Sequence, residues 1–305
     1  MLSKLRNWSE HPHFAATVST MGEAKHKTAE AGGKAKLGTL PEWNLADLYQ
    51  GPESPKLKAD LENSERAADA MQERYAGKLA ALLDGGKGAA LAQAVREFEA
   101  LNDVLGRIVS YASLLYAADT SDPKRQKFFG DIQEKITAIS SKLLFFPLEL
   151  NRLEDAMLET AMAKSELSHY RPWLEDLRKE KPYQLEDKLE QLFHEKAVTA
   201  RGAWDRLFNE TMTSLRFETE GEKLSLEPTL NRLLDPDGDK RREAAQALAK
   251  VFKENVRLFT LITNTLAKDK EISDRWRGFK DVADSRHLAN RVEPEVVQAL
   301  SLIHI

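Results

Sequence analysis

The sequence contains no cysteine, so disulfides and thiolate metal ligands are excluded, and any zinc site would have to use histidine and carboxylate side chains. No apolar run approaches the ~18 residues that a membrane-spanning helix requires, and the first 20 residues lack the apolar core of a secretory signal. Neither charge is in clear excess: 45 basic and 49 acidic residues give a net charge of −4, without the basic face that nucleic acids require. These absences predict a soluble cytoplasmic protein with no nucleic-acid or membrane partner.

The sequence also lacks the common catalytic motifs, such as a glycine-rich phosphate loop or a nucleophile elbow. His194-Glu195 is its one His-Glu pair, and a zinc-binding helix would need a second histidine at position 198, which is valine. We therefore expect no catalytic residue and no metal ligand in this chain, and the sequence does not identify the substrate-binding residues.

Apolar residues recur every three or four positions along most of the chain, which is the period of an amphipathic helix. The expected helices cover residues 55–76, 91–115, 123–147, 147–163, 166–179, 185–212 and 239–277. The last segment contains no glycine or proline, so we expect one uninterrupted helix there. Near the start, we expect Asn44 to cap a short turn that buries Trp43.

The period changes to two between Leu215 and Leu226, on either side of the turn Glu220-Gly221-Glu222, which predicts a β-hairpin. The predicted fold is therefore all-α, mainly antiparallel helices, with one small β-hairpin near 215–226.

Several segments, in order along the chain, resemble oligoendopeptidase F, a bacterial relative of thimet oligopeptidase. They are "LPEWNLADLY" (40–49), "HYRPWLEDLRKEKPYQLEDKLEQL" (169–192), "ARGAWDRLFNETMTSLRF" (200–217), "NTLAKDKEISDRWRGF" (264–279) and "SRHLANRVEPEVV" (285–297). The resemblance implies a zinc endopeptidase that cleaves short unstructured peptides in a channel between helical halves. In such a site two histidines and a glutamate hold Zn²⁺, and the glutamate of the His-Glu pair is the general base. That motif is expected beyond Ile305, so this chain would be an inactive fragment truncated before the zinc-binding helix.

The resemblance also implies a domain division. Residues 1–40 are rich in Ala, Gly and Lys, so we expect a disordered or mis-annotated extension, with translation starting at Met1 or at Met21. Residues 41–199 would form a helical N-terminal domain, and residues 200–300 the beginning of the metallopeptidase catalytic domain. Residues 301–305 depart from the family pattern and, with Leu300, match the translation of a transposon adapter used for sequencing libraries, so we expect a non-native tail.

Two clusters are candidates for parts of a substrate cleft. His169, Tyr170 and Arg171 could line a groove, but a helix start with the Tyr170 ring in the core is favoured, since buried aromatic residues are common. Arg286 and His287 either form a cleft wall, or Arg286 is a surface residue that pairs with Asp284 or Glu293. The sequence leaves this second choice open.

Other candidate ligands are interpreted structurally. The acidic loop Asp235–Asp239 lacks the ligand spacing of a calcium loop and is expected to be a turn and a helix cap. His11, His13 and His26 lie in the tail and are expected to be solvated. The alternative function, from a different class, is a non-catalytic helical scaffold or peptide-binding module, and the sequence leaves the oligomeric state unknown.

Overall fold

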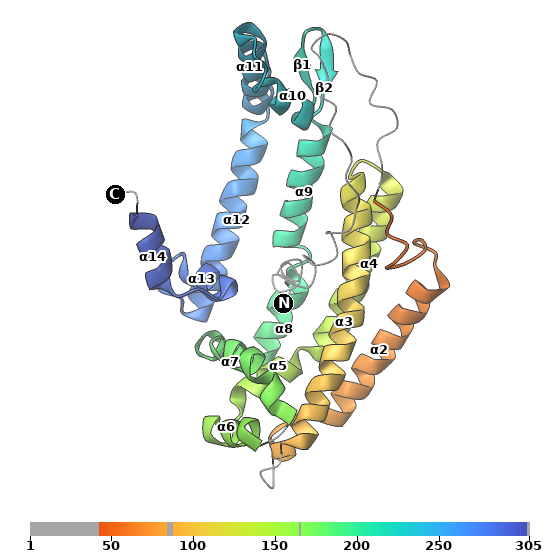
Figure 1. Ribbon diagram of the computed structural model, residues 1–305, viewed down its shortest axis with the longest axis vertical. Helices are drawn as coiled ribbons and strands as arrows, with labels where there is room; N and C mark the ends of the chain where they lie inside the picture. Colours follow the sequence, from red (N-terminus) through yellow and green to blue (C-terminus); the bar gives the residue numbers. More distant parts are fainter. Residues whose placement is uncertain (1–42, 84–87, 165, 304–305) are drawn as a thin grey trace, which may run out of the picture.

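The structure is a computed structural model that describes residues 43–83, 88–164 and 166–303. Within these ranges it confirms a mainly helical fold with one small hairpin (Figure 1). The whole of the expected extension 1–40, with its three histidines, and the last two residues lie outside the described residues. None of the described helices has the length and apolar content that a membrane span requires.

Three long helices pack side by side as a bundle: α2 (Pro55–Tyr75), α3 (Ala89–Ala118) and α4 (Pro123–Leu143) (Figure 1). Both α2 and α4 begin with proline, whose missing N–H costs nothing at that position. The Asp122 side chain caps α4 by accepting a hydrogen bond from the Lys124 amide at 2.7 Å. The expected helices 55–76, 91–115 and 123–147 thus correspond to α2, α3 and α4, although α4 ends four residues early.

Short helices close the lower end of the bundle. They are η2 (Ala80–Leu83), α5 (Phe145–Arg152), α6 (Asp155–Lys164), η3 (Glu166–Tyr170), α7 (Arg171–Arg178) and η4 (Lys181–Tyr183). The prediction of one helix over 147–163 was wrong. The side chain of Arg178 donates to the carbonyl oxygens of Leu150 (2.9 Å) and Leu153 (2.8 Å), which satisfies the end of α5 and lets the chain turn into α6.

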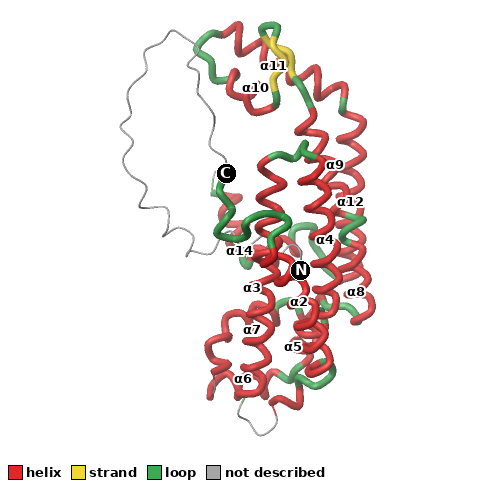
Figure 2. The backbone as a smooth tube through the Cα atoms, turned by 90° about the vertical axis from the view of Figure 1, so that its right-hand side faces the viewer, coloured by secondary structure: helices red, strands yellow, loops and turns green. Residues whose placement is uncertain are grey.

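The chain then leaves the bundle through α8 (Asp187–Lys196) and α9 (Arg201–Ser214) and reaches the hairpin of β1 (Phe217–Thr219) and β2 (Glu222–Leu224). Phe217 pairs with Leu224 and Thr219 with Glu222, around Glu220 and Gly221, which both have positive φ. The strands lie at the far end of the molecule from the short helices (Figure 2). The hairpin is confirmed at the predicted place.

After the hairpin come α10 (Leu226–Arg232), α11 (Gly238–Glu254), α12 (Val256–Arg277), α13 (Asp284–Asn290) and α14 (Pro294–Leu302). We call α12 to α14 the C-terminal arm, because α12 runs back along α9 towards the bundle (Figure 1).

Two long helices predicted from periodicity are broken in the structure. The helix over 239–277 is interrupted at Asn255, which has φ −101° and ψ 3° and whose side-chain amide donates to the Val251 carbonyl at 2.9 Å. The helix over 185–212 is interrupted at 197–200, where the Gly202 amide reaches back to the Ala197 carbonyl at 2.9 Å. A Cβ at position 202 would lie 3.0 Å from that oxygen, which explains why glycine suits the bend.

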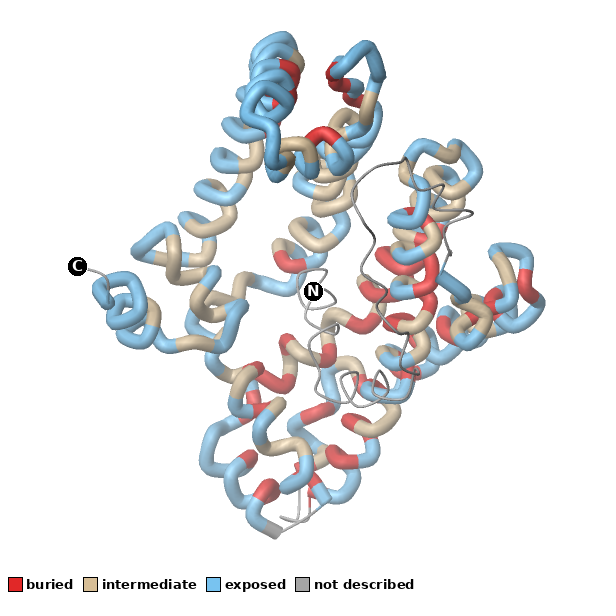
Figure 3. Tube along the Cα trace, turned by 45° about the horizontal axis from the view of Figure 1, so that its top comes forward, coloured by how far each residue is buried: buried red, intermediate tan, exposed pale blue. Residues whose placement is uncertain are grey.

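Buried residues are distributed unevenly (Figure 3). One cluster of 30 buried side chains extends from Tyr49 to Leu177 and forms the core of the bundle, with the rings of Phe98 and Phe146 stacked at 4.6 Å. A second cluster contains four buried residues, all from the hairpin region and α11: Leu215, Phe217, Ala247 and Leu248. Trp43 is 79% exposed, so its predicted burial was wrong, although Asn44 does accept a hydrogen bond from the Ala46 amide at 3.0 Å.

Candidate functional site

His194 lies on α8 with its ring against the Thr137 backbone of α4. Its Nε2 atom is buried and has no hydrogen-bond partner among the described residues. Burial lowers the pKa of the imidazole, because the charged form loses its hydration. His194 therefore packs between helices.

The His169 block is structural in the way that the favoured interpretation requires. The Tyr170 ring is partly buried against the bundle core, and its hydroxyl donates to Glu99 Oε2 at 2.8 Å. Burial, followed by this hydrogen bond, raises the pKa of Tyr170 to about 12. Arg171 pairs with Glu159 at 2.9 Å on the surface.

Arg286 and His287 lie on the short helix α13. Within the described part of the chain, neither acidic partner considered for Arg286 pairs with it. Asp284 instead accepts hydrogen bonds from the amides of Asp281 (2.9 Å) and Lys280 (3.3 Å), so it organises its own turn. A role for Arg286 and His287 in a cleft stays a prediction.

The acidic loop before α11 is a turn and a helix cap, as predicted. Asp235 Oδ1 accepts from the Asp237 amide at 2.9 Å, and Asp237 Oδ1 accepts from the Asp239 amide at 2.8 Å. Across all described residues, no group of three or more His, Asp or Glu side chains is placed to hold a metal ion.

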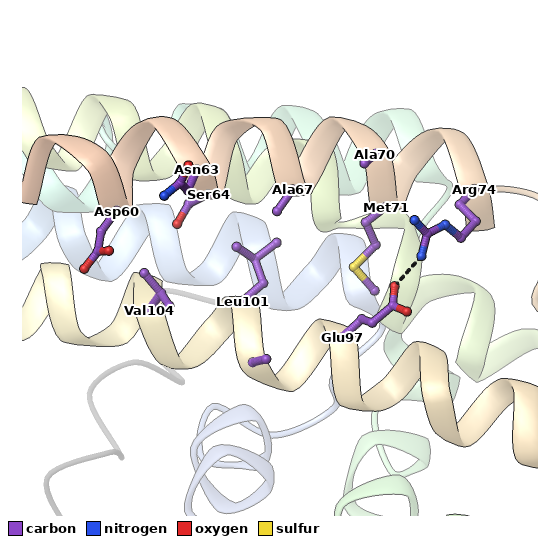
Figure 4. Close-up of a pocket in the computed structure, with 11 residues that line it drawn as sticks. Asp60, Asn63, Ser64, Ala67, Ala70, Met71, Arg74, Glu97, Leu101 and Val104 are labelled. Atoms are coloured by element: carbon purple, nitrogen blue, oxygen red, sulfur yellow. Dashed lines mark hydrogen bonds and ion pairs between the residues drawn. The ribbon is translucent and has the colours of Figure 1, made fainter. Parts of the chain in front are cut away.

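Two open hollows are present, and neither contains an evident reactive group. A groove of about 570 Å³ between α2 and α3 has alanines and Met71 on its walls and the Arg74–Glu97 ion pair, at 2.9 Å, at one end (Figure 4). A hollow of about 700 Å³ lies beside the start of α8, where Gln184 and Asn151 each keep a buried side-chain oxygen without a partner in the described structure.

The C-terminal half of the chain exposes many large apolar side chains. Among the described residues, thirteen of the sixteen exposed large apolar side chains lie between Leu192 and Ile303, whereas only six of the 38 buried apolar residues, alanines included, do. Helix α12 has one buried residue, Ile262, although its sequence is as periodic as that of the bundle helices. The exposed large apolar residues on α9 and α12 are Leu207, Phe208, Val256, Leu261 and Trp276. These side chains are of types that are usually buried in a core or an interface.

A buried ion pair that apolar periodicity does not predict joins α8 and α12. Arg277 donates through Nη1 and Nη2 to the two carboxylate oxygens of Glu190, at 2.6 and 2.8 Å. Burial opposes ionisation of Glu190, but hydrogen bonds from Arg277 and from the Leu185 amide outweigh it, so the pKa of the carboxyl lies below its ordinary value. A signal was present, since Arg277 continues the apolar stripe of Ile262 and Leu266 at helical spacing.

The family model described as Oligopeptidase F matches residues 149–217, from α5 to β1. Over 307 residues the chain is 24% identical to Oligopeptidase PepF from Bacillus subtilis, and the alignment covers 96% of this chain. Its fold is similar to the crystal structure of oligoendopeptidase-F from Enterococcus faecium, with a TM-score of 0.67 and 17% identity over 80% of this chain. The chain therefore resembles the oligoendopeptidase F family in sequence and in fold.

The alignments cover only part of these relatives. This chain matches 43% of the Bacillus subtilis protein and 49% of the Enterococcus faecium chain. A putative peptidase from Chlamydophila abortus, with a TM-score of 0.50 and 15% identity, is likewise matched over 43% of its length. The chain thus spans less than half the length of the family members it matches.

Proposed function

We propose that this chain is the N-terminal part of a zinc-dependent oligoendopeptidase that hydrolyses short peptides in the cytoplasm, and that the chain is inactive by itself. The resemblance to oligoendopeptidase F supports the peptidase class. The finer points, namely zinc, the fragment and the location, come from the resemblance and from the sequence.

The observation that carries the fragment proposal is the apolar surface on α9 and the C-terminal arm. A 22-residue helix with a single buried residue has little to stabilise it in water, because isolated helices are marginal without packing of their apolar face. The family relatives have more than half of their length outside the match. In the longer protein, packing of that remaining part against Leu261 and Trp276 would bury the apolar face of α12.

The residues described here do not fit a zinc site. His194 has no second histidine or carboxylate beside it in a metal-binding arrangement, and its free Nε2 lies buried between helices. No catalytic step is therefore assigned to a residue of this chain, and Zn²⁺ is proposed as a cofactor of the longer protein only.

The domain boundary near residue 199 is part of the proposal. The two separate clusters of buried residues, one ending at Leu177 and the other beginning at Leu215, support a division between them. We propose residues 41–199 as the helical N-terminal domain and 200–300 as the beginning of the catalytic domain, with residues 301–305 as a non-native tail.

The proposal is tested by assaying the purified chain with a quenched fluorescent oligopeptide, with and without added Zn²⁺, beside the Bacillus subtilis Oligopeptidase PepF as a positive control. We expect no cleavage above the blank and no stoichiometric zinc by elemental analysis. Cleavage that is lost with a chelator and in the His194→Ala variant would contradict the inactive-fragment proposal.

The same proposal predicts the reading frame of the gene. Amplification of the locus from source DNA should show that the frame continues past codon 300 into a His-Glu-x-x-His motif. An in-frame stop after the same last codons would favour the alternative, a non-catalytic helical scaffold or peptide-binding module.

A further inference from the structure

The ion pair between Glu190 and Arg277 joins segments that are 87 residues apart. Glu190, 9% exposed, is the most buried charged residue in the part of the chain that the structure describes. Each group is well satisfied: Glu190 Oε1 also accepts from the Leu185 amide at 2.8 Å, and Arg277 Nη1 also donates to the Tyr183 carbonyl at 3.1 Å.

Aromatic rings surround the pair. The Arg277 guanidinium lies 5.7 Å from the centre of the Phe193 ring, and the rings of Tyr183 and Phe279 stack at 4.0 Å. We call Tyr183, Glu190, Phe193, Arg277 and Phe279 the clamp. It connects η4 and α8 with the end of α12, where the arm approaches the bundle (Figure 1).

The clamp holds the far end of α12, and an ion pair between Arg291 and Asp176 of α7, at 3.1 Å, also joins the arm to the bundle. Near the start of α12, the Phe259 ring contacts Phe208 of α9 at 5.9 Å and Phe252 of α11 at 6.2 Å. At 1.5 Å per residue, Phe259 and Arg277 are about 27 Å apart along the helix. Ile262 is the one buried residue of α12, so the direction of the far end depends on the contacts made there, of which the Glu190–Arg277 pair is more buried than the Arg291–Asp176 pair.

A buried ion pair is poorly suited to supplying stability alone, because removing two charges from water offsets most of their attraction. Its geometry is what an apolar contact cannot reproduce: a bidentate arginine–carboxylate pair fixes both the distance and the relative orientation of its two helices. We propose that Glu190 and Arg277 are positioning residues that set the angle and register of the C-terminal arm on the bundle. This proposal does not depend on peptidase activity.

The absence of cysteine makes a direct test possible. Cysteines introduced at Met157 of α6 and Val296 of α14, which are 43% and 54% exposed, would be the only thiols, and spin labels on them report the distance between bundle and arm. Pulsed electron paramagnetic resonance should give one narrow distance distribution in the parent chain. The Glu190→Leu/Arg277→Leu variant should keep its helical circular dichroism but give a distribution roughly twofold broader, because apolar contacts are non-directional.

Two further variants separate positioning from packing. Arg277→Lys keeps the charge but loses the fork, so it should broaden the distribution to an intermediate degree. Lys268→Leu/Glu271→Leu removes an exposed pair, at 2.6 Å on the same helix, and should leave the distribution narrow.

Two outcomes would overturn the proposal. A double-leucine variant with the parent's narrow distribution would show that the pair does not set the position of the arm. Loss of helical structure in that variant would show that the pair is required for stability instead.

Discussion

Replacement of Phe217 by alanine tests whether the bundle and the hairpin region are separate folding units. Phe217 is fully buried, and its ring lies 5.6 Å from that of Phe252. It belongs to the cluster of four buried residues, which shares no member with the bundle core. The substitution should therefore unfold the hairpin and α11 and leave the bundle intact.

The size of the smaller cluster gives the magnitude. Its three large side chains, Leu215, Phe217 and Leu248, contribute about 1.5 to 3 kcal/mol each, or roughly 5 to 9 kcal/mol before ordering costs are subtracted. A buried Phe→Ala substitution costs about 3 to 5 kcal/mol. Phe217→Ala thus removes roughly half of the free energy that burial of these three side chains contributes. Phe146→Ala removes the same amount from a core of 30 buried residues.

Hydrogen–deuterium exchange read by mass spectrometry measures each region separately. In Phe217→Ala, amides of β1 and α11 should lose protection while those of α3 keep theirs. In Phe146→Ala, the control, the slowest amides of α3 should exchange faster but remain protected. Equal loss of protection in α3 and α11 after Phe217→Ala would show a single cooperative unit and refute the reasoning.

Three smaller effects follow from other contacts. Folding lowers the pKa of His194, so its contribution to stability is fully present at pH values above its ordinary pKa of about 6.5 and is lost as the pH falls below that value. In urea unfolding from about pH 7.5 to 5.5, His194→Gln should weaken this decline of the midpoint. An unchanged slope would contradict the assignment to His194. Gly278 ends α12 with φ +78°, so Gly278→Ala should cost about 1 kcal/mol in urea unfolding, and a neutral result would mean that this cap does not limit stability. The Tyr49 hydroxyl donates to Asp60 at 2.8 Å, so Tyr49→Phe should cost about 1 to 2 kcal/mol, with Asp60→Asn as the matched variant; no change in either would contradict a stabilising bond.

Periodicity predicted the bundle helices and the hairpin because their apolar spacing is complete within each segment. It failed at Asn255 and at 197–200, where the apolar spacing continues across the break. These breaks depend on contacts that spacing does not encode, such as the Asn255 amide on the Val251 carbonyl. The end of α5 is likewise set by Arg178, 25 residues later in the chain than the carbonyl of Leu153.

The candidate site was predictable only as a resemblance. Leu207 and Phe208 are large apolar residues of the helix predicted over 185–212, and they are 38% and 42% exposed. Hydrophobicity specifies that a side chain needs a partner but not which segment supplies it. The Glu190–Arg277 pair was overlooked for a related reason, since charged residues are usually assigned to the solvated face.

The bundle core is built from residues 49–177 alone, and this has a consequence for synthesis on the ribosome. At about 5 to 20 residues per second, the 87 residues between Glu190 and Arg277 take roughly 4 to 17 seconds to translate. The bundle can close during that interval, because none of its buried residues comes from the later part of the chain. Until Arg277 has been synthesised, Glu190 is a solvated carboxylate without this partner. The arm then docks onto a bundle that is already folded.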